Sequence, residues 1–142
     1  MCLTLTKNSE KETKKLIEHR KKVSKKNYII AYKNARLKGD NLYPYYRANS
    51  WGPYKIGENV SNRNGTKLNY AEKERGEIMF GFHVYLNKKD AKQKTWVNKV
   101  IIPIKIYLDD IVSIGHFGGE DSLVCTKFTI SEKDYNKAIK KG

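Results

Sequence analysis

Two histidines, His83 and His116, are the side chains of this sequence best suited to acid–base chemistry. His83 stands between aromatic residues in an apolar run, and His116 opens the glycine-rich stretch HFGGED. If neighbouring strands bring the two together, one imidazole can accept a proton while the other donates one, and Glu120 or Asp121 can orient one of them. Such a pair would cleave RNA or act on a nucleotide without a metal ion. Isolated histidines in strands are more often structural, so this catalytic interpretation is the less favoured one.

No metal site and no cofactor motif are predicted. His19, the other two histidines and the cysteines Cys2 and Cys125 lack the paired short spacings of a zinc site. The glycine-rich stretch matches neither GxxxxGK[ST] nor GxGxxG, so it predicts no phosphate loop. We expect Cys125 to be a small core residue and the compartment to be reducing.

Electrostatic binding of phosphates is indicated by residues 9–26, SEKETKKLIEHRKKVSKK. Ser9 with Glu12 three residues later is a capping-box pattern, which predicts the start of a helix. At about 100° per residue, Leu16 and Ile17 lie opposite an arc of lysines. Such an arc attracts phosphates without reading sequence, and a solvated surface without a partner is the equally weighted alternative. The lysines of this arc are Lys11, Lys14, Lys15, Lys21, Lys22, Lys25 and Lys26.

The segment LYPYYRANSWGPYKIG, residues 42–57, combines aromatic rings with two cations. Rings beside Arg or Lys in a loop can stack on unpaired bases. Tyr and Trp more often cap a small core, and that is the favoured role. The candidate contact residues of this segment are Tyr45, Tyr46, Arg47, Trp51 and Lys55.

Apolar patterning predicts the elements that would position these side chains. The organising strand is expected over residues 77–86 and runs into a helix opened by Asn87. Pro103 within a later strand predicts an edge position or a bulge, because proline lacks an amide donor. Ser131 is expected to open a C-terminal helix. Further strands are predicted over residues 27–36, 98–108, 111–115 and 122–130, and a short strand or turn over residues 55–60.

The predicted elements do not alternate regularly between strand and helix. The expected class is therefore α+β, with a mainly antiparallel mixed sheet, a middle helix and a short C-terminal helix. We expect a basic amphipathic helix or arm over residues 1–26 and a single α+β domain over residues 27–142.

The charge balance favours a polyanion as partner. The 142 residues carry 29 Lys and Arg against 15 Asp and Glu, a formal net charge of +14. Such a field suits nucleic acid or a nucleic-acid-processing complex, although a lysine-rich surface without a specific partner remains the plain alternative. No apolar run of about 18 residues predicts a membrane span. No signal-peptide pattern is visible either, so we expect a cytoplasmic protein.

Three pieces of the chain resemble a pattern of small uncharacterised phage and prophage accessory proteins. The resemblance rests on a Gly-Phe-His strand motif and on a later strand, Asp-containing turn and glycine-rich loop, and it implies no catalytic residue. It implies a product that acts in the host cytoplasm by binding a host defence or nucleic-acid machine, as anti-CRISPR proteins do. The matching pieces are YKIGENVSNRN (54–64), EKERGEIMFGFHVYLNKKDA (72–91) and VIIPIKIYLDDIVSIGHFGGEDSLVCTKFTI (100–130).

The sequence thus favours a non-enzymatic binding protein whose lysine-rich face engages nucleic acid or a host protein–nucleic acid complex. The alternative is a metal-independent enzyme that uses His83 and His116.

Overall fold

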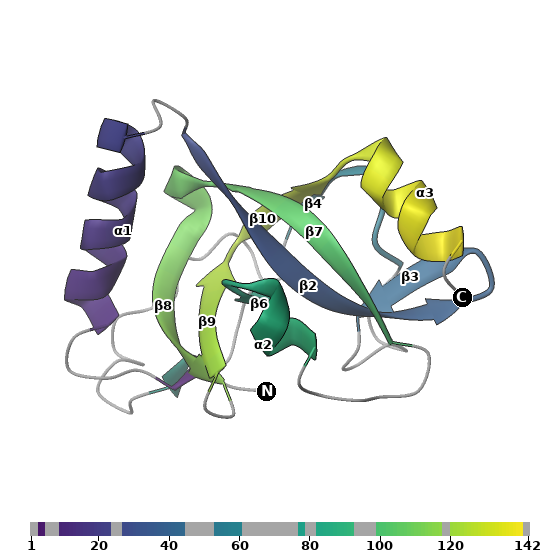
Figure 1. Ribbon diagram of the computed structural model, residues 1–142, viewed down its shortest axis with the longest axis horizontal. Helices are drawn as coiled ribbons and strands as arrows, with labels where there is room; N and C mark the ends of the chain where they lie inside the picture. The colour runs from purple at the N-terminus through teal and green to yellow at the C-terminus, as the bar shows by residue number, and fades with distance from the viewer. Residues whose placement is uncertain are drawn as a thin grey trace.

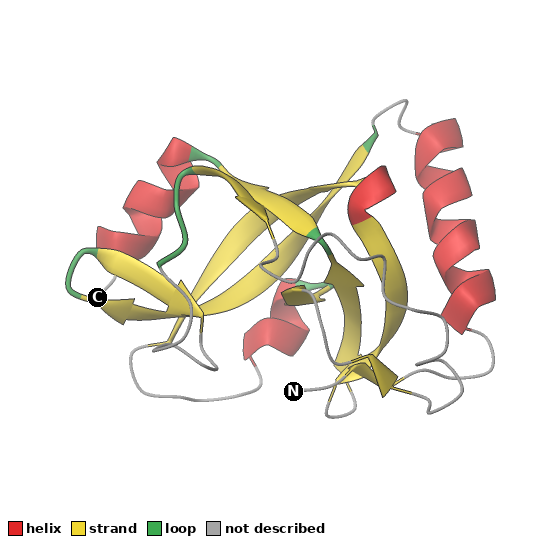
Figure 2. Cartoon of the chain, turned by 180° about the vertical axis from the view of Figure 1, so that it is seen from behind, coloured by secondary structure: helices red, strands yellow, loops and turns green. Residues whose placement is uncertain are grey.

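The computed structural model describes residues 3–4, 9–23, 27–44, 53–60, 77–78, 82–92, 99–117 and 120–140. An antiparallel sheet is flanked by an N-terminal and a C-terminal helix (Figures 1 and 2), which confirms the predicted α+β class. The helices are α1 (Ser9–Val23), α2 (Lys88–Lys92), the 3-10 helix η2 (Leu108–Asp110) and α3 (Glu132–Lys140). The strands are β1 (Leu3–Thr4), β2 (Tyr28–Lys38), β3 (Asn41–Pro44), β4 (Gly57–Val60), β5 (Glu77–Ile78), β6 (Phe82–Tyr85), β7 (Lys99–Tyr107), β8 (Ile111–Phe117), β9 (Glu120–Cys125) and β10 (Lys127–Ile130).

Local sequence signals account for the ends of several elements. Asn87 caps α2, since its Oδ1 accepts a hydrogen bond from the Asp90 amide at 2.9 Å. Ser131 caps α3 in the same way, accepting from the Asp134 amide at 3.1 Å. Gly39 has a φ of 63° in the turn between β2 and β3, a conformation that favours glycine. The two predicted helix starts are confirmed.

The sheet curls back on itself. Its strand order is β4-β10-β7-β2-β6-β9-β8-β1-β5, with β3 paired to β2. Strands β9 and β10 are separated by three strands in this order, yet only Thr126 joins them along the chain. The sheet must therefore bend until β9 and β10 meet, as strands do when a sheet closes toward a barrel. Figure 1 shows β8 and β9 standing steeply beside the long diagonal pair β2 and β7.

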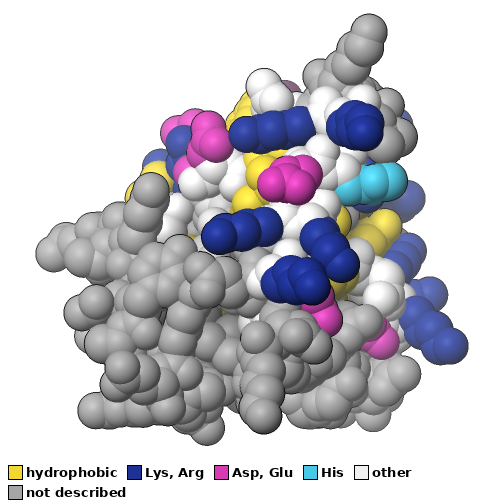
Figure 3. Space-filling model, turned by 90° about the vertical axis from the view of Figure 1, so that its left-hand side faces the viewer, with side chains coloured by type: hydrophobic (Ala, Val, Ile, Leu, Met, Phe, Trp, Pro, Cys, Tyr) yellow, Lys and Arg dark blue, Asp and Glu magenta, His cyan; other side chains and the backbone are white. Residues whose placement is uncertain are grey.

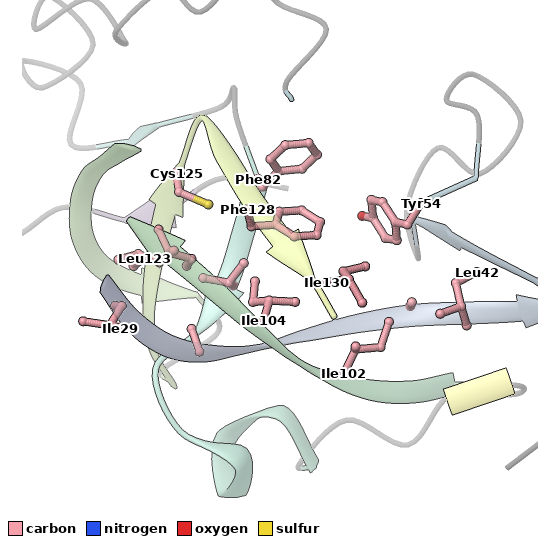
Figure 4. Close-up of a cluster of buried hydrophobic side chains, with 14 of the residues drawn as sticks. Ile29, Leu42, Tyr54, Phe82, Ile102, Ile104, Leu123, Cys125, Phe128 and Ile130 are labelled. Carbon is pink, nitrogen blue, oxygen red and sulfur yellow. The ribbon is translucent and has the colours of Figure 1, made fainter. Parts of the chain in front are cut away.

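The inside of the curl is filled with apolar side chains drawn from both halves of the sheet (Figure 4). Phe82 of β6 and Phe128 of β10 meet edge to face with their ring centroids 4.6 Å apart. The ring centroids of Tyr54 and Phe128 are 5.4 Å apart. Cys125 is fully buried in this cluster, which confirms its predicted role as a core residue.

Two strands predicted as continuous are each divided. The expected strand over 77–86 is wrong: β5 pairs with β1 at one end of the strand order, whereas β6 lies between β2 and β9. The expected strand over 122–130 is also wrong, because β9 and β10 occupy different parts of the sheet. The chain turns a corner at Thr126, between β9 and β10. The apolar pattern continues through this corner because both strands face the same core. The corner does leave a trace: the buried positions change phase, from Leu123 and Cys125 to Phe128 and Ile130.

The predicted edge position or bulge at Pro103 is wrong. β7 lies between β10 and β2, and Pro103 pairs in regular register with Tyr32. Thr129 of β10 pairs with Lys105, so the position opposite Pro103 falls at Ser131, just beyond the end of β10. A proline is tolerated inside this sheet because no residue of β10 lies opposite it.

Helix α1 packs on β8 through one side only. Leu16 and Ile17 pack against the core cluster, and the buried Thr13 accepts a hydrogen bond through Oγ1 from the Ile114 amide at 2.9 Å. Among the described residues, β1 pairs with β8 at a single position, Thr4 with His116. Thr13 therefore gives the edge of β8 the acceptor that a neighbouring strand would otherwise supply.

Replacing Thr13 by valine should lower the free energy of unfolding by about 1–3 kcal/mol, because the Ile114 amide loses its acceptor at a buried position. Thr13→Ser keeps the hydroxyl and is the matched control. Urea titrations of the three proteins measure the difference. Equal stability of the valine and serine variants would contradict this role of the hydroxyl.

Candidate nucleic-acid interface

Five of the seven lysines predicted to share an arc lie within α1, and all five are on its solvent side. The helix is anchored by Thr13, Leu16 and Ile17, and its lysines project away from that contact and are exposed. Figure 3 shows basic side chains gathered over this side of the molecule, with fewer acidic ones among them. Glu18 is the one acidic residue within the arc. We define the lysine face as Lys11, Lys14, Lys15, Lys21 and Lys22.

Of the contact residues predicted in the segment 42–57, Lys55 lies within the described residues. Lys55 is exposed just before β4, and the Asn59 side chain fixes the backbone there by bonding both the amide and the carbonyl of Lys55. β4 is at one end of the strand order, whereas α1 packs on β8 near the other end. The predicted residues Lys25, Lys26, Tyr45, Tyr46, Arg47 and Trp51 lie outside the described residues.

A different aromatic and basic cluster lies on the outer side of β2 and β7. Tyr28 pairs with Tyr107 across the two strands, and their rings meet edge to face with centroids 6.3 Å apart. Lys105 places its Nζ 4.4 Å from the centroid of the Tyr28 ring. Ile30 pairs with Lys105 and is 47% exposed, and Tyr107 is 41% exposed. We call Tyr28, Ile30, Lys105 and Tyr107 the outer platform.

The outer positions of β2 and β7 carry cations but no acidic residue. The positions that alternate with the core include Arg36 and Lys99, which pair across the two strands, as well as Lys105. This cluster could not be recognised from the sequence, because Tyr28 and Tyr107 are distant along the chain and only strand pairing joins them. The one available signal was that both tyrosines sit at the ends of predicted strands.

The lysine face and the outer platform are consecutive along the chain. Tyr28 follows Lys22 by six positions, which limits their Cα distance to about 20 Å. The Leu108 amide donates to the Asn27 carbonyl at 2.8 Å, so the start of β2 is tied to the end of β7. The basic last turn of α1, with Arg20, Lys21 and Lys22, is therefore close in the chain to the platform.

The two histidines of the catalytic hypothesis are not on neighbouring strands. His83 lies on β6 and His116 on β8, with β9 between them. On β9, His83 pairs with Val124 and His116 pairs with Asp121, and these two partners are three residues apart. The Cα atoms of the two histidines are therefore about 14 Å apart. The expectation that neighbouring strands bring them together is therefore corrected. The side chains of His116 and Glu120 lie outside the described part of the structure.

A lysine is buried inside the curl of the sheet. Lys33 of β2 is 8% exposed, and its Nζ donates to the His83 carbonyl at 2.7 Å. Burial lowers the pKa of Lys33 from 10.5 to about 8, and the nearby Cys125 partly offsets this shift. Burial likewise raises the pKa of the Cys125 thiol to about 12. At neutral pH the thiol is protonated and is not a reactive thiolate.

No helix in the described ranges is both long enough and apolar enough to span a membrane. Among the same residues, no cluster of three or more His, Cys, Asp or Glu side chains could hold a metal ion. Comparisons with protein-family models, with curated proteins and with solved structures find no match to this chain.

Proposed function

We propose that this protein binds nucleic acid by contacts between the lysine face of α1 and the phosphate backbone. The observation that carries the proposal is the division of α1 into two sides. The side with Thr13, Leu16 and Ile17 is docked on the sheet, and the opposite side presents five exposed lysines.

Docking makes the lysine face a better phosphate site than a detached basic arm. Fixing the helix holds the ammonium groups in one array before binding, so less conformational entropy is lost on binding. Lysines that neutralise phosphates release counterions, which gives affinity without sequence preference and makes that affinity fall steeply with salt. The net charge of +14 adds a long-range attraction that speeds the encounter.

The wider setting stays a prediction. The resemblance to phage and prophage accessory proteins predicts an anti-defence inhibitor in the host cytoplasm, whose target is a host complex that handles nucleic acid. The positive charge of the lysine face suits such a target. It would bind the phosphates that the host complex handles, or cover an acidic surface of that complex. The catalytic alternative is not favoured by the separation of His83 and His116.

Replacing Lys14, Lys21 and Lys22 by glutamate should weaken nucleic-acid binding at least about tenfold near physiological salt, because attractive contacts become repulsive. Glutamine at the same positions should lower the slope of log affinity against log salt by about one for each lysine that contacts a phosphate. Fluorescence anisotropy with labelled oligonucleotides, from low to near-physiological salt, measures both effects.

The matched control reverses Lys133, Lys137 and Lys140 on α3, which are also exposed and change the net charge equally. If the α3 variant loses as much affinity as the α1 variant, binding follows total charge and the lysine face is not the site. If the wild-type protein binds no nucleic acid at low salt, the proposed function is wrong and the partner has to be sought among acidic proteins.

A further inference from the structure

We infer that the preferred ligand is single-stranded nucleic acid, with an unpaired base stacked on Tyr107 of the outer platform while the lysine face holds the adjoining phosphates. This inference rests on the proposed function and adds to it a strand preference and a second contact surface.

The exposure of the platform is the first argument. Tyr107 and Ile30 are among the few large apolar side chains left exposed in the described part of the chain. Tyr107 sits at the end of β7, and its ring packs against the Tyr28 ring at an interplanar angle of 75°. An exposed ring whose position is fixed by a neighbouring ring loses little freedom when a base stacks on it.

The chemistry of the platform is the second argument. Lys105 lies over the Tyr28 ring, so a cation stands beside the exposed aromatic surface. No acidic residue occupies the outer positions of β2 and β7, and Lys105 is the cation next to the two tyrosines, since Arg36 and Lys99 pair at the other end of these strands. Proteins that bind single strands combine these features, since aromatic rings stack with bases while the cations beside them follow the backbone.

The third argument concerns what a duplex can reach. In duplex nucleic acid the faces of the bases are stacked on one another, so they are not available to a protein ring without unpairing. The lysine face alone would bind single strands and duplexes through their phosphates. The platform therefore adds affinity only for single strands. Because it follows the basic end of α1 by six residues, one strand of a few nucleotides can contact both.

The test compares a labelled oligothymidylate of about 16 nucleotides with a duplex of the same length, using the full chain. Tyr107→Ala should weaken binding of the single strand roughly tenfold and change duplex binding less than about twofold. Tyr107→Phe keeps the ring and should retain wild-type affinity for both. A thermal melt of each variant checks that the fold is intact, and if the alanine variant is unstable, Tyr107→Leu, which keeps an apolar side chain but has no aromatic ring, takes its place.

The outcomes separate this inference from the proposed function. A single-strand preference that Tyr107→Ala removes and Tyr107→Phe keeps would establish the platform. Equal binding of both ligands with no effect of Tyr107→Ala would overturn the platform and leave the lysine face standing. If Tyr107→Ala lowers the affinity for the single strand and for the duplex equally, the platform is also overturned, since a stacking residue contacts unpaired bases only. No binding of either ligand by the wild-type protein would remove the proposed function and this inference together.

Discussion

Replacing the buried Lys33 by methionine should stabilise the fold by about 2 kcal/mol at pH 7. The lowering of its pKa from 10.5 to about 8 corresponds to a burden of about 3 kcal/mol for keeping a charged ammonium inside the core. Methionine is close to lysine in length and carries no charge. About 1 kcal/mol of the gain is offset, because the His83 carbonyl loses its hydrogen bond from Lys33 Nζ.

The pH dependence gives this prediction a second readout. Between about pH 8 and 10.5 the unfolded chain keeps the Lys33 proton that the folded protein has lost, so stability rises with pH. Cys125 acts in the opposite sense: its pKa rises from 9.0 to about 12 on folding, so stability falls above pH 9. Burial also raises the pKa of Tyr54, which adds to that fall above pH 10. Wild-type stability should therefore rise from about pH 8 to 9, change little up to about pH 10 because the two effects cancel, and fall above that. Lys33→Met should show no rise and should fall from about pH 9.

Urea unfolding at pH 7, 8, 9 and 10 measures both effects. The control is Lys38→Met, an exposed lysine on the same strand, which should change stability by less than about 0.5 kcal/mol. If Lys33→Met lowers the free energy of unfolding at pH 7 by more than about 1 kcal/mol, the prediction is contradicted. Such a loss would mean that the bond between Lys33 and His83, which joins β2 to β6, contributes more than burial of the charge costs.

Replacing Phe128 by alanine should lower the free energy of unfolding by about 4 kcal/mol. The side chain is 1% exposed, and its ring packs against both Phe82 and Tyr54. Domains of this kind are stable by only about 5–15 kcal/mol, so this one change removes a large share of the total. Chemical denaturation followed by near-ultraviolet circular dichroism measures the loss.

The milder replacements Phe82→Leu and Phe128→Leu test the curl of the sheet itself. The two rings come from β6 and β10, which are not hydrogen-bonded to each other, and they touch only if the sheet folds over. A double-mutant cycle should give a coupling of about 1 kcal/mol. The control cycle pairs Phe128→Leu with Ile30→Val on the outer face and should give less than about 0.5 kcal/mol. No coupling between Phe82 and Phe128 would mean that the two halves of the sheet do not meet.

The sheet as a whole was only partly predictable. Long strands such as β2 and β7 follow from runs of β-branched and aromatic residues, and their approximate limits were expected. The corner at Thr126 was missed because residues on both sides of it face the same core, so apolar alternation continues with only a one-residue change of phase. The position of Pro103 was missed for a related reason: whether a missing amide matters depends on where β10 ends, which is a property of another strand.

The candidate site divides in the same way. The lysine face was predictable because a helix places residues 3.6 apart on one side, and Thr13, Leu16 and Ile17 identify the side that docks. The outer platform was not predictable, because Tyr28 and Tyr107 meet only through strand pairing.

By itself, then, the sequence determined the α+β class, the basic helix with its lysine face, the helix caps and the positive charge. Each of these depends on residues close together in the chain or on composition alone. Only the tertiary structure decided that the sheet curls, that Lys33 is enclosed with Cys125, that His83 and His116 are kept apart, and that two tyrosines form an exposed pair. The physical reason is that strand order and register are set by contacts between distant segments, and local patterning carries no record of which segments those are.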